Sequence, residues 1–364
     1  MYRRVAGVGL ALTMLVAGCG HSSSTSQGPA TSSTPVPSVA TSSTRAASAT
    51  SQAARDLPDP HTLRGLTEVP ELPDPKPVEG SSAQKLPVTV TDVEGNKVTI
   101  KSTSRILALD LYGTLSRTLI GLGLGDKIVG RTVSSTEKQL HDRPVVTENG
   151  HVLNVEAVAG LKPSVIIADR SVGPKEALDQ LRKSGIPVVL VDPHRSVGST
   201  PQLIRTIADA VGKPDAGEAL VKRTQEQIDQ AKKQIAAWKP AKPMRVAFLY
   251  VRGNAGVFFI LGSENGASEL IQGVGADDVA SDKGITTLVP ANAESLVSIN
   301  PDAIFVMRDG LASTGGMKGL LARAGVANTT AGRKQRVISI PDGISLSFGP
   351  QTGEVLTAVA KALY

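Results

Sequence analysis

The sequence is poor in the residues that form disulfides, aromatic clusters and catalytic signatures. Its 364 residues include one cysteine, Cys19, so no disulfide can form within the chain, and aromatic residues make up 3% of it. It has no G-x-S-x-G elbow, Walker loop or HExxH helix, and its glycines at 121, 123 and 125 miss the G-x-G-x-x-G spacing. The formal charge of +6 is spread along the chain without a basic block, which gives a nucleic-acid-binding role no support. These absences argue against an enzyme and against a nucleic-acid-binding protein.

The first residues have the pattern of an export signal. Arginines at positions 3 and 4 precede an apolar run over residues 5–16, and no later run of about 18 apolar residues could cross a membrane. Residues 16–19, Val-Ala-Gly-Cys, resemble the lipobox of bacterial lipoproteins. That resemblance implies a signal peptide over residues 1–18, cleavage before Cys19 and a lipid, such as palmitate, on the Cys19 thiol. We expect a protein anchored on the extracytoplasmic face of the cell membrane; a secretory signal with an incidental cysteine is the alternative.

The composition changes after the signal. Residues 20 to about 84 are rich in serine, threonine, alanine and proline, and they contain almost no large apolar side chains. Such a segment cannot bury a core. Residues 19–85 are therefore predicted to form a disordered tether, which is stiffer in the proline-rich piece near residues 70–77.

The rest of the chain alternates between predicted strands and helices. Apolar and polar residues alternate around Glu94-Gly95-Asn96, which predicts a hairpin over residues 88–100. Short apolar strands then alternate with amphipathic helices, which is typical of βα units on a mostly parallel sheet. We predict an N-terminal α/β lobe over residues 86–212. Its strands are expected at 106–110, 128–131, 164–168 and 188–192, and its helices at 112–122, 154–161, 174–183 and 200–211.

A long helix and a second lobe follow. Apolar residues recur at helical spacing from Leu220 to Trp238, which predicts a connecting helix within residues 213–240, about 35 Å long. The strand–helix pattern then restarts over residues 241–364. The sequences NVEAVAGLKPSVII from Asn154 and NAESLVSINPDAIF from Asn292 share an asparagine, a glutamate, an aliphatic residue and a proline in register. Two similar lobes are therefore predicted.

The second lobe begins with RVAFLYVRGNAGVFF, residues 245–259, an apolar strand that stops at a glycine-rich loop. Tyr250 and Arg252 are two residues apart near the end of this strand, so they share one face. A phenolate oxygen suits a hard ferric ion, and a neighbouring cation favours the phenolate. We interpret Tyr250 as a metal ligand in a binding cleft, with Phe258 and Phe259 as candidates for an apolar wall.

This layout resembles a known family. A lipobox, a tether, two α/β lobes and one connecting helix form the arrangement of the substrate-binding lipoproteins of ABC importers for siderophores, cobalamin and haem. Their fold is the class III periplasmic-binding-protein type, and the resemblance covers residues 86–364. It implies a binding protein, not an enzyme, that acts as a monomer with the permease and ATPase subunits of an importer. It also implies that Glu156 and Glu294 dock onto arginines of the permease.

The haemin-binding lipoproteins of haem importers (HmuT-type) are the branch that is matched more closely. They carry an axial histidine in an Asn-Gly-His segment and an axial tyrosine in a Leu-Tyr-Val-Arg-Gly segment. This chain has those sequences at residues 149–151 and 249–253. The resemblance implies that His151 and Tyr250 ligate haem iron from the two lobes, and that Arg252 hydrogen-bonds the tyrosine. The ligand is then haem for iron uptake, received free or from haem-donor proteins at the cell surface.

Haem also carries propionates, which favour cationic partners. Arg170 and Arg308 come directly after strands that are predicted to end at the cleft. These two arginines are candidates for that role.

Three other interpretations remain open from the residues alone. A ferric siderophore or cobalamin could occupy the same fold, although siderophore sites use several arginines and aromatic residues. A lipid-anchored enzyme would need a catalytic motif that the sequence does not show. A receptor for a divalent metal would need more ligands than one histidine and one tyrosine.

Overall fold

A short parallel sheet that is apolar on both faces forms the centre of the N-terminal lobe. The computed structural model describes residues 57–79, 83–253 and 256–364, all of which fall in one unit, residues 47–364. The strands lie in the order β5-β4-β8-β9, and all neighbours are parallel. They are β4 (Ile106–Leu109), β5 (Ile128–Gly130), β8 (Val165–Ala168) and β9 (Val188–Leu190).

Helices cover both faces of this sheet. Alternate strand residues face two different cores, one closed by α2 (Thr114–Gly121) and α5 (Thr200–Ala210) and the other by α3 (Val155–Gly160) and α4 (Lys175–Lys183). Because both faces are covered, the strands are nearly continuous apolar runs. Two hairpins complete the lobe: the predicted one, β2 (Val88–Thr91) with β3 (Lys97–Ile100), and a shorter one, β6 (Thr147–Glu148) with β7 (Val152–Leu153).

The C-terminal lobe repeats this plan on a larger mixed sheet, in the order β1-β15-β14-β10-β11-β13, with β12 beside β10. Its strands are β1 (Leu66–Glu68), β10 (Arg245–Arg252), β11 (Val257–Ile260), β12 (Asp277–Asp278), β13 (Val289–Pro290), β14 (Ala303–Met307) and β15 (Val337–Ile340). One face packs on α7 (Ala267–Gly273), α12 (Asp342–Ser345) and α13 (Thr352–Leu363). The other packs on α8 (Ala293–Ile299), α9 (Arg308–Ser313), α10 (Gly316–Leu321) and α11 (Thr330–Lys334).

Short 3₁₀ turns join several of these elements. They are η1 (Pro60–Thr62), η2 (Gly125–Lys127), η3 (Lys138–Leu140), η4 (Ser263–Asn265), η5 (Ser281–Lys283) and η6 (Val326–Asn328).

The two lobes contain the repeated unit that the sequence predicts. Asn154 and Asn292 cap α3 and α8 in the same way, each accepting a hydrogen bond of 2.9 Å from the third backbone N–H of its helix. Both units then place a non-glycine residue in the left-handed region just before the shared proline, Lys162 at φ 48° and Asn300 at φ 35°. The match therefore extends to the backbone conformation.

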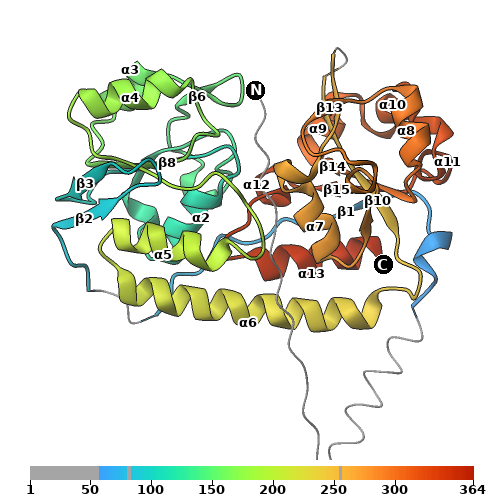
Figure 1. Cartoon of the computed structure of the whole chain (residues 1–364), viewed down its shortest axis with the longest axis horizontal. Coiled ribbons are helices and arrows are strands. Elements are labelled where there is room, and N and C mark those ends of the chain that lie inside the picture. The colour runs from blue at the N-terminus through green and yellow to red at the C-terminus, as the bar shows by residue number, and fades with distance from the viewer. Residues whose placement is uncertain (1–56, 80–82, 254–255) are drawn as a thin grey trace, which may run out of the picture. The chain divides into compact units, whose positions relative to one another are not determined.

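One long helix connects the lobes. α6 (Pro214–Trp238) has 25 residues and begins with proline at its first position, where the missing N–H costs nothing. It packs against α5 of the first lobe and α13 of the second, and Figure 1 shows it running beneath both. The predicted fold, two similar α/β lobes with mostly parallel sheets and one long connecting helix, is confirmed.

The prediction that residues 57–79 belong to a disordered tether is wrong. The strand β1 pairs in parallel with β15 at the edge of the C-terminal sheet, with Leu66 opposite Val337. Val69, directly after this strand, is fully buried in the core of that lobe. A three-residue strand between prolines has too little alternation to stand out in the sequence, which explains the error. The prediction also fails at residues 83–85, where the N–H of Lys85 donates to the carbonyl of Gly212 at 2.8 Å. Of the rest of the predicted signal peptide and tether, residues 1–56, with Cys19 among them, and residues 80–82 lie outside the described residues.

Residues 66–79, which we call the strap, continue from the C-terminal lobe onto the N-terminal lobe. The Asp74 carboxylate accepts hydrogen bonds from the backbone N–H groups of Lys138 (2.8 Å) and Gln139 (2.9 Å) at the start of η3. Arg223 of α6 donates to the carbonyls of Lys76 (2.6 Å) and Pro77 (3.3 Å). Prolines suit this course because they hold the backbone extended and bring no N–H that must be paired. The strap thus contacts both lobes and the connecting helix.

A buried charged cluster lies past the ends of β4 and β8. Asp110 and Asp169 follow these strands, and the guanidinium of Arg195 contacts the Asp169 carboxylate and lies 3.7 Å from that of Asp110. Its Cζ is 5.6 Å from the centre of the Tyr112 ring. Burial and the neighbouring Asp169 raise the pKa of Asp110 to about 7. Burial also raises the pKa of Asp169.

Replacing Asp74 tests the contribution of the strap to stability. Asp74→Ala removes the acceptor from two backbone N–H groups, so we expect the free energy of unfolding to fall by about 1 kcal/mol. Urea unfolding followed by circular dichroism measures this change. Asp142→Ala, which alters a fully exposed carboxylate nearby, should leave the midpoint unchanged. Equal midpoints for Asp74→Ala and the wild type would contradict a stabilising strap.

The raised pKa of Asp110 predicts a pH-dependent stability. Between the ordinary value of 3.8 and about 7 the folded protein holds a proton on Asp110 that the unfolded chain has lost. This group therefore lowers the free energy of unfolding as the pH rises through that window. A carboxamide cannot ionise, so Asp110→Asn should flatten the fall between about pH 4 and about pH 7. Urea unfolding at several pH values measures it, with the exposed Asp126→Asn as control. An unchanged pH profile in Asp110→Asn would refute the assignment.

Candidate functional site

Tyr250 and Arg252 lie at the carboxyl end of β10, on one face of the strand as predicted. The Cζ atom of Arg252 is 4.9 Å from the centre of the Tyr250 ring. Tyr250 is half-buried against the core of the C-terminal lobe. The guanidinium thus lies over the ring, where the π electrons attract it. In the described structure it makes no hydrogen bond to the Tyr250 hydroxyl, which differs from the contact that the resemblance implies.

The carboxylate of Asp342 also holds the guanidinium of Arg252 in place. Nη2 of Arg252 donates to Oδ1 of Asp342 at 2.5 Å and approaches Sδ of Met307 at 3.4 Å. The second oxygen, Oδ2, accepts a hydrogen bond of 2.8 Å from the backbone N–H of Asp309. Burial raises the pKa of Asp342, against the opposing effects of the Asp309 N–H and Arg252. The site is therefore built at the carboxyl ends of neighbouring strands, from the last residues of β10 and β14 and from the starts of α9 and α12.

The backbone beside this pair leaves room for the arginine. A Cβ atom on Gly310 would lie 2.1 Å from Nη1 of Arg252 and 2.5 Å from the carbonyl oxygen of Val251. Only glycine fits there without displacing the guanidinium. Ser313, one turn later on α9, accepts a hydrogen bond of 2.9 Å from the backbone N–H of Gly253. The short helix α9 thus fixes the end of the strand that carries Tyr250.

The two phenylalanines of the predicted apolar wall lie on opposite faces of β11. Phe259 is paired directly with Tyr250 and shares its face. Phe258 is paired with Val251, is 8% exposed and belongs to the core on the other side of the sheet. The guanidinium of Arg323 covers its ring at 5.6 Å. The prediction that Phe258 lines the cleft is therefore wrong, because neighbouring residues of a strand point to opposite faces.

His151 lies in the turn between β6 and β7 of the N-terminal lobe. Asn149 (φ 49°) and Gly150 (φ 89°) form the tight turn, and the His151 carbonyl accepts a hydrogen bond of 2.9 Å from the N–H of Gly173. The pairing of β6 with β7 and this hydrogen bond hold the backbone, while the His151 side chain is exposed. Among the described residues, no contact joins His151 to Tyr250 or Arg252.

Arg170 and Arg308, the predicted propionate partners, are both engaged elsewhere. Arg170 makes two hydrogen bonds of 2.8 Å with Glu94 and one of 3.1 Å with Asp179, and its guanidinium lowers the pKa of Glu94. Arg308 binds Glu71 of the strap at 2.6 Å and the carbonyl of Val69. The structure contradicts the prediction that these arginines are open for propionates. Each follows a strand as expected, but each ties two segments of its lobe together.

Asp342 is a residue of the site that was not predicted from the sequence. It comes one residue, Pro341, after the apolar strand β15, and Arg308 comes directly after β14. A charged residue close behind a buried strand was therefore the available signal. Its partner Arg252 is far away in the sequence. Strand pairing alone brings the two together.

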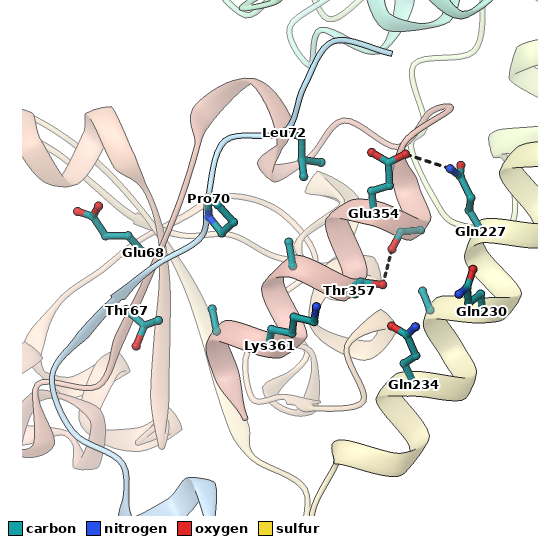
Figure 2. Close-up of a pocket in the computed structure, with 14 residues that line it drawn as sticks. Thr67, Glu68, Pro70, Leu72, Gln227, Gln230, Gln234, Glu354, Thr357 and Lys361 are labelled. Carbon is teal, nitrogen blue, oxygen red and sulfur yellow. Dashed lines mark hydrogen bonds between the residues drawn. The ribbon is translucent and has the colours of Figure 1, made fainter. Parts of the chain in front are cut away.

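Two hollows lie near the strap, and neither is lined by His151 or Tyr250, the predicted iron ligands. One, of about 250 Å³, is bordered by Asp342, Arg117, Lys138, Arg308 and the strap. Figure 2 shows the other, of about 560 Å³, between the strap, α6 and α13. Gln227 of α6 donates a hydrogen bond of 3.0 Å to Glu354 of α13 there. The Tyr250 site is separate from this groove.

Glu156 and Glu294 occupy the same position of α3 and α8, the second residue of each helix. Both are exposed, and neither carboxylate has a hydrogen bond or ion pair within the described residues. In each lobe the helix lies on the side away from α6 (Figure 1). The two carboxylates are therefore available to a partner.

The described residues hold neither a membrane-spanning helix nor a metal-binding cluster. None of their helices is both long and apolar enough for a membrane span. No group of three or more histidine, cysteine, aspartate or glutamate side chains in this part of the chain could hold a metal ion.

Known proteins resemble this chain over most of its length. It is 27% identical over 280 residues to an uncharacterized ABC transporter substrate-binding lipoprotein, YvrC, of Bacillus subtilis (strain 168), covering 76% of this chain and 86% of that one. Among solved structures, the heme binding protein HmuT is 49% identical, with a TM-score of 0.83, over 84% of this chain and 99% of that one. The periplasmic heme-binding protein RhuT from Roseiflexus sp. RS-1, in apo form, is 32% identical, with a TM-score of 0.67, over 72% and 98%.

Further HmuT structures carry one alanine in place of a histidine, a tyrosine or an arginine. In that chain the replaced arginine comes two positions after the replaced tyrosine, as Arg252 comes after Tyr250 here. The replaced histidine precedes the tyrosine by the same number of residues as His151 precedes Tyr250.

A family model settles the class of protein. The model for periplasmic binding proteins matches residues 111–343, which include much of both lobes and the whole connecting helix. The relatives above are substrate-binding proteins and not enzymes. The chain belongs to the periplasmic binding protein family.

Proposed function

We propose that this protein captures haem outside the cytoplasm and delivers it to the permease of an ABC importer. The observation that carries the proposal is the Tyr250–Arg252 pair at the end of β10, with the guanidinium 4.9 Å from the ring centre. The same tyrosine–arginine spacing, and the same distance back to a histidine, occurs among the residues replaced in HmuT.

The chemistry of the pair suits ferric haem. A phenolate oxygen is a hard ligand for iron, and tyrosine is an established haem ligand. Arg252 places a positive charge at the face of the ring, which favours the anionic phenolate that binds the metal. Since Asp342 and Met307 hold the guanidinium in place, the cation already lies over the ring before the ligand arrives. Tyr250 is thus prepared to act as an axial ligand.

His151 is proposed as the second axial ligand, from the other lobe. Its ring is exposed on a turn whose backbone is held by Gly173. A neutral imidazole is a common ligand for iron. One ligand from each lobe would couple haem capture to the relative position of the lobes.

Glu156 and Glu294 are proposed to dock on the permease. They are fixed on matching helices, and they have no partner within the described residues. Two carboxylates on separate lobes give a two-point electrostatic register for positively charged residues of a partner. Lipid on Cys19 would keep the protein near that permease, and haem-donor proteins at the cell surface would be its suppliers.

Titration with haemin tests the ligand. The chain from residue 20 onward, which keeps the strap, should form a stoichiometric complex with a shifted Soret band. Tyr250→Phe and His151→Ala should each lower the affinity at least about tenfold, because each removes a coordinating atom. Tyr364→Phe, which changes a tyrosine bonded to the Val274 carbonyl, and His141→Ala are matched controls that should bind normally. Absence of a saturable change, with Trp238 fluorescence quenched instead by a ferric siderophore or cobalamin, would overturn the haem proposal.

Removing both docking carboxylates tests delivery. Glu156→Ala with Glu294→Ala should reduce haem uptake by cells at least about tenfold while leaving the haemin affinity of the purified protein unchanged. Glu176→Ala with Glu264→Ala is the matched control, since Glu176 is also the exposed second residue of a helix. Normal uptake by the first double variant would rule out docking through these residues.

A further inference from the structure

We propose that Asp342 is a positioning residue that holds Arg252 over the ring of Tyr250 and thereby strengthens the binding of haem by that tyrosine. The proposal rests on the proposed function for the identity of the ligand. It adds a residue that touches neither Tyr250 nor the expected position of the iron.

Both oxygens of the Asp342 carboxylate are engaged in ways that fix its direction. Oδ1 accepts the hydrogen bond of 2.5 Å from Arg252, and Oδ2 accepts that of 2.8 Å from the Asp309 N–H. The side chain is 17% exposed. Because the second bond comes from the backbone of α9, the carboxylate cannot rotate away from Arg252 without leaving an N–H unpaired.

Arg252 depends on this anchor. Its side chain is 32% exposed, and a long flexible side chain at such a site samples many rotamers unless it is held. Its other contacts are weak, a hydrogen bond of 3.2 Å from Nη1 to the Val251 carbonyl and the approach of Nη2 to the Met307 sulfur. Asp342 supplies the one charged partner among the described residues, and charge-assisted hydrogen bonds are the strong ones.

The segment that carries Asp342 is itself clamped by the N-terminal lobe. Nε of Arg117, on α2, donates to the carbonyl oxygen of Gly343 at 3.2 Å, and its Nη1 donates to Gln351 at 2.8 Å. A Cβ atom on Gly343 would lie 1.9 Å from Oγ1 of Thr136. The start of α12 is therefore gripped on one side by Arg117 and on the other by Arg252. The backbone that carries the Asp342 carboxylate is thus held in place.

Asp342 has two opposed effects on the tyrosine, and they can be separated. It orients the cation beside the tyrosine that would bind the iron, but its own negative charge partly cancels that cation. Arg252 without an anchor would move into solvent, where its effect on the ring is screened. We therefore expect orientation to outweigh cancellation.

Haemin titrations of Asp342 variants, with double variants, provide the test. Asp342→Ala should weaken haemin affinity about tenfold, as loss of a supporting residue around a metal ligand does, and should shift the tyrosinate-to-iron charge-transfer band. In the Arg252→Ala background the same change should have no further effect, because the two residues act together. Asp282→Ala, which changes an exposed carboxylate elsewhere in the C-terminal lobe, is the control and should bind normally.

Two more measurements keep the outcomes distinct. Asp342→Asn retains the volume and one acceptor oxygen, so it should lose less affinity than alanine; tighter binding than wild type would overturn the proposal in favour of charge cancellation. In the protein without haemin, NMR of the Arg252 guanidinium should show its slow N–H exchange lost in Asp342→Ala and partly retained in Asp342→Asn. Three results for Asp342→Ala would each refute positioning by Asp342: wild-type N–H exchange, wild-type haemin affinity, or a loss of affinity that adds fully to that of Arg252→Ala. If Tyr250→Phe also leaves haemin binding intact, the proposed function itself fails.

Discussion

The packing of one helix face into two separate hydrophobic cores is the constraint on which the structure depends. α6 places Leu220 in the core of the N-terminal lobe and Ile235 in that of the C-terminal lobe, both buried. Burying a side chain of this size stabilises by about 2 kcal/mol, so neither contact is easily exchanged. The strap and the Arg117–Gly343 hydrogen bond join the same two lobes independently. A change in the angle between the lobes must therefore bend α6 or break one of these links.

Much of the fold was predictable because its signals are local. Buried strands and amphipathic helices have different apolar periods, and proline marks the ends of several elements, so strand and helix boundaries fall within a few residues of those expected. The strap was not predictable in this way. Its strand β1 gains its stability from pairing with β15, which is distant in the sequence, and its prolines suggest a linker. Tertiary pairing decided the structure there, and local composition did not.

The residues of the site were also predictable only where their signal is local. Tyr250 and Arg252 are two residues apart, so strand alternation alone places them together, and Phe259 joins them through the neighbouring strand. Arg170 and Arg308 were expected to be open because they follow strands, yet each found carboxylates or carbonyls from distant segments. Sequence position can place a charged residue at an edge of the sheet. It cannot say whether a partner from elsewhere in the fold already occupies it.

Covering the site with a flat ligand changes what the Arg252–Asp342 pair contributes. In the free protein the guanidinium is 32% exposed, and an ion pair at such a position is worth roughly 0–1 kcal/mol. A bound porphyrin would exclude water, and breaking a buried ion pair then costs about 3–5 kcal/mol. Ferric porphyrin carries one net positive charge, which the phenolate balances, while Asp342 balances Arg252. Asp342 therefore stabilises the bound state more than the free one, which is the condition for a residue to affect affinity and not only folding.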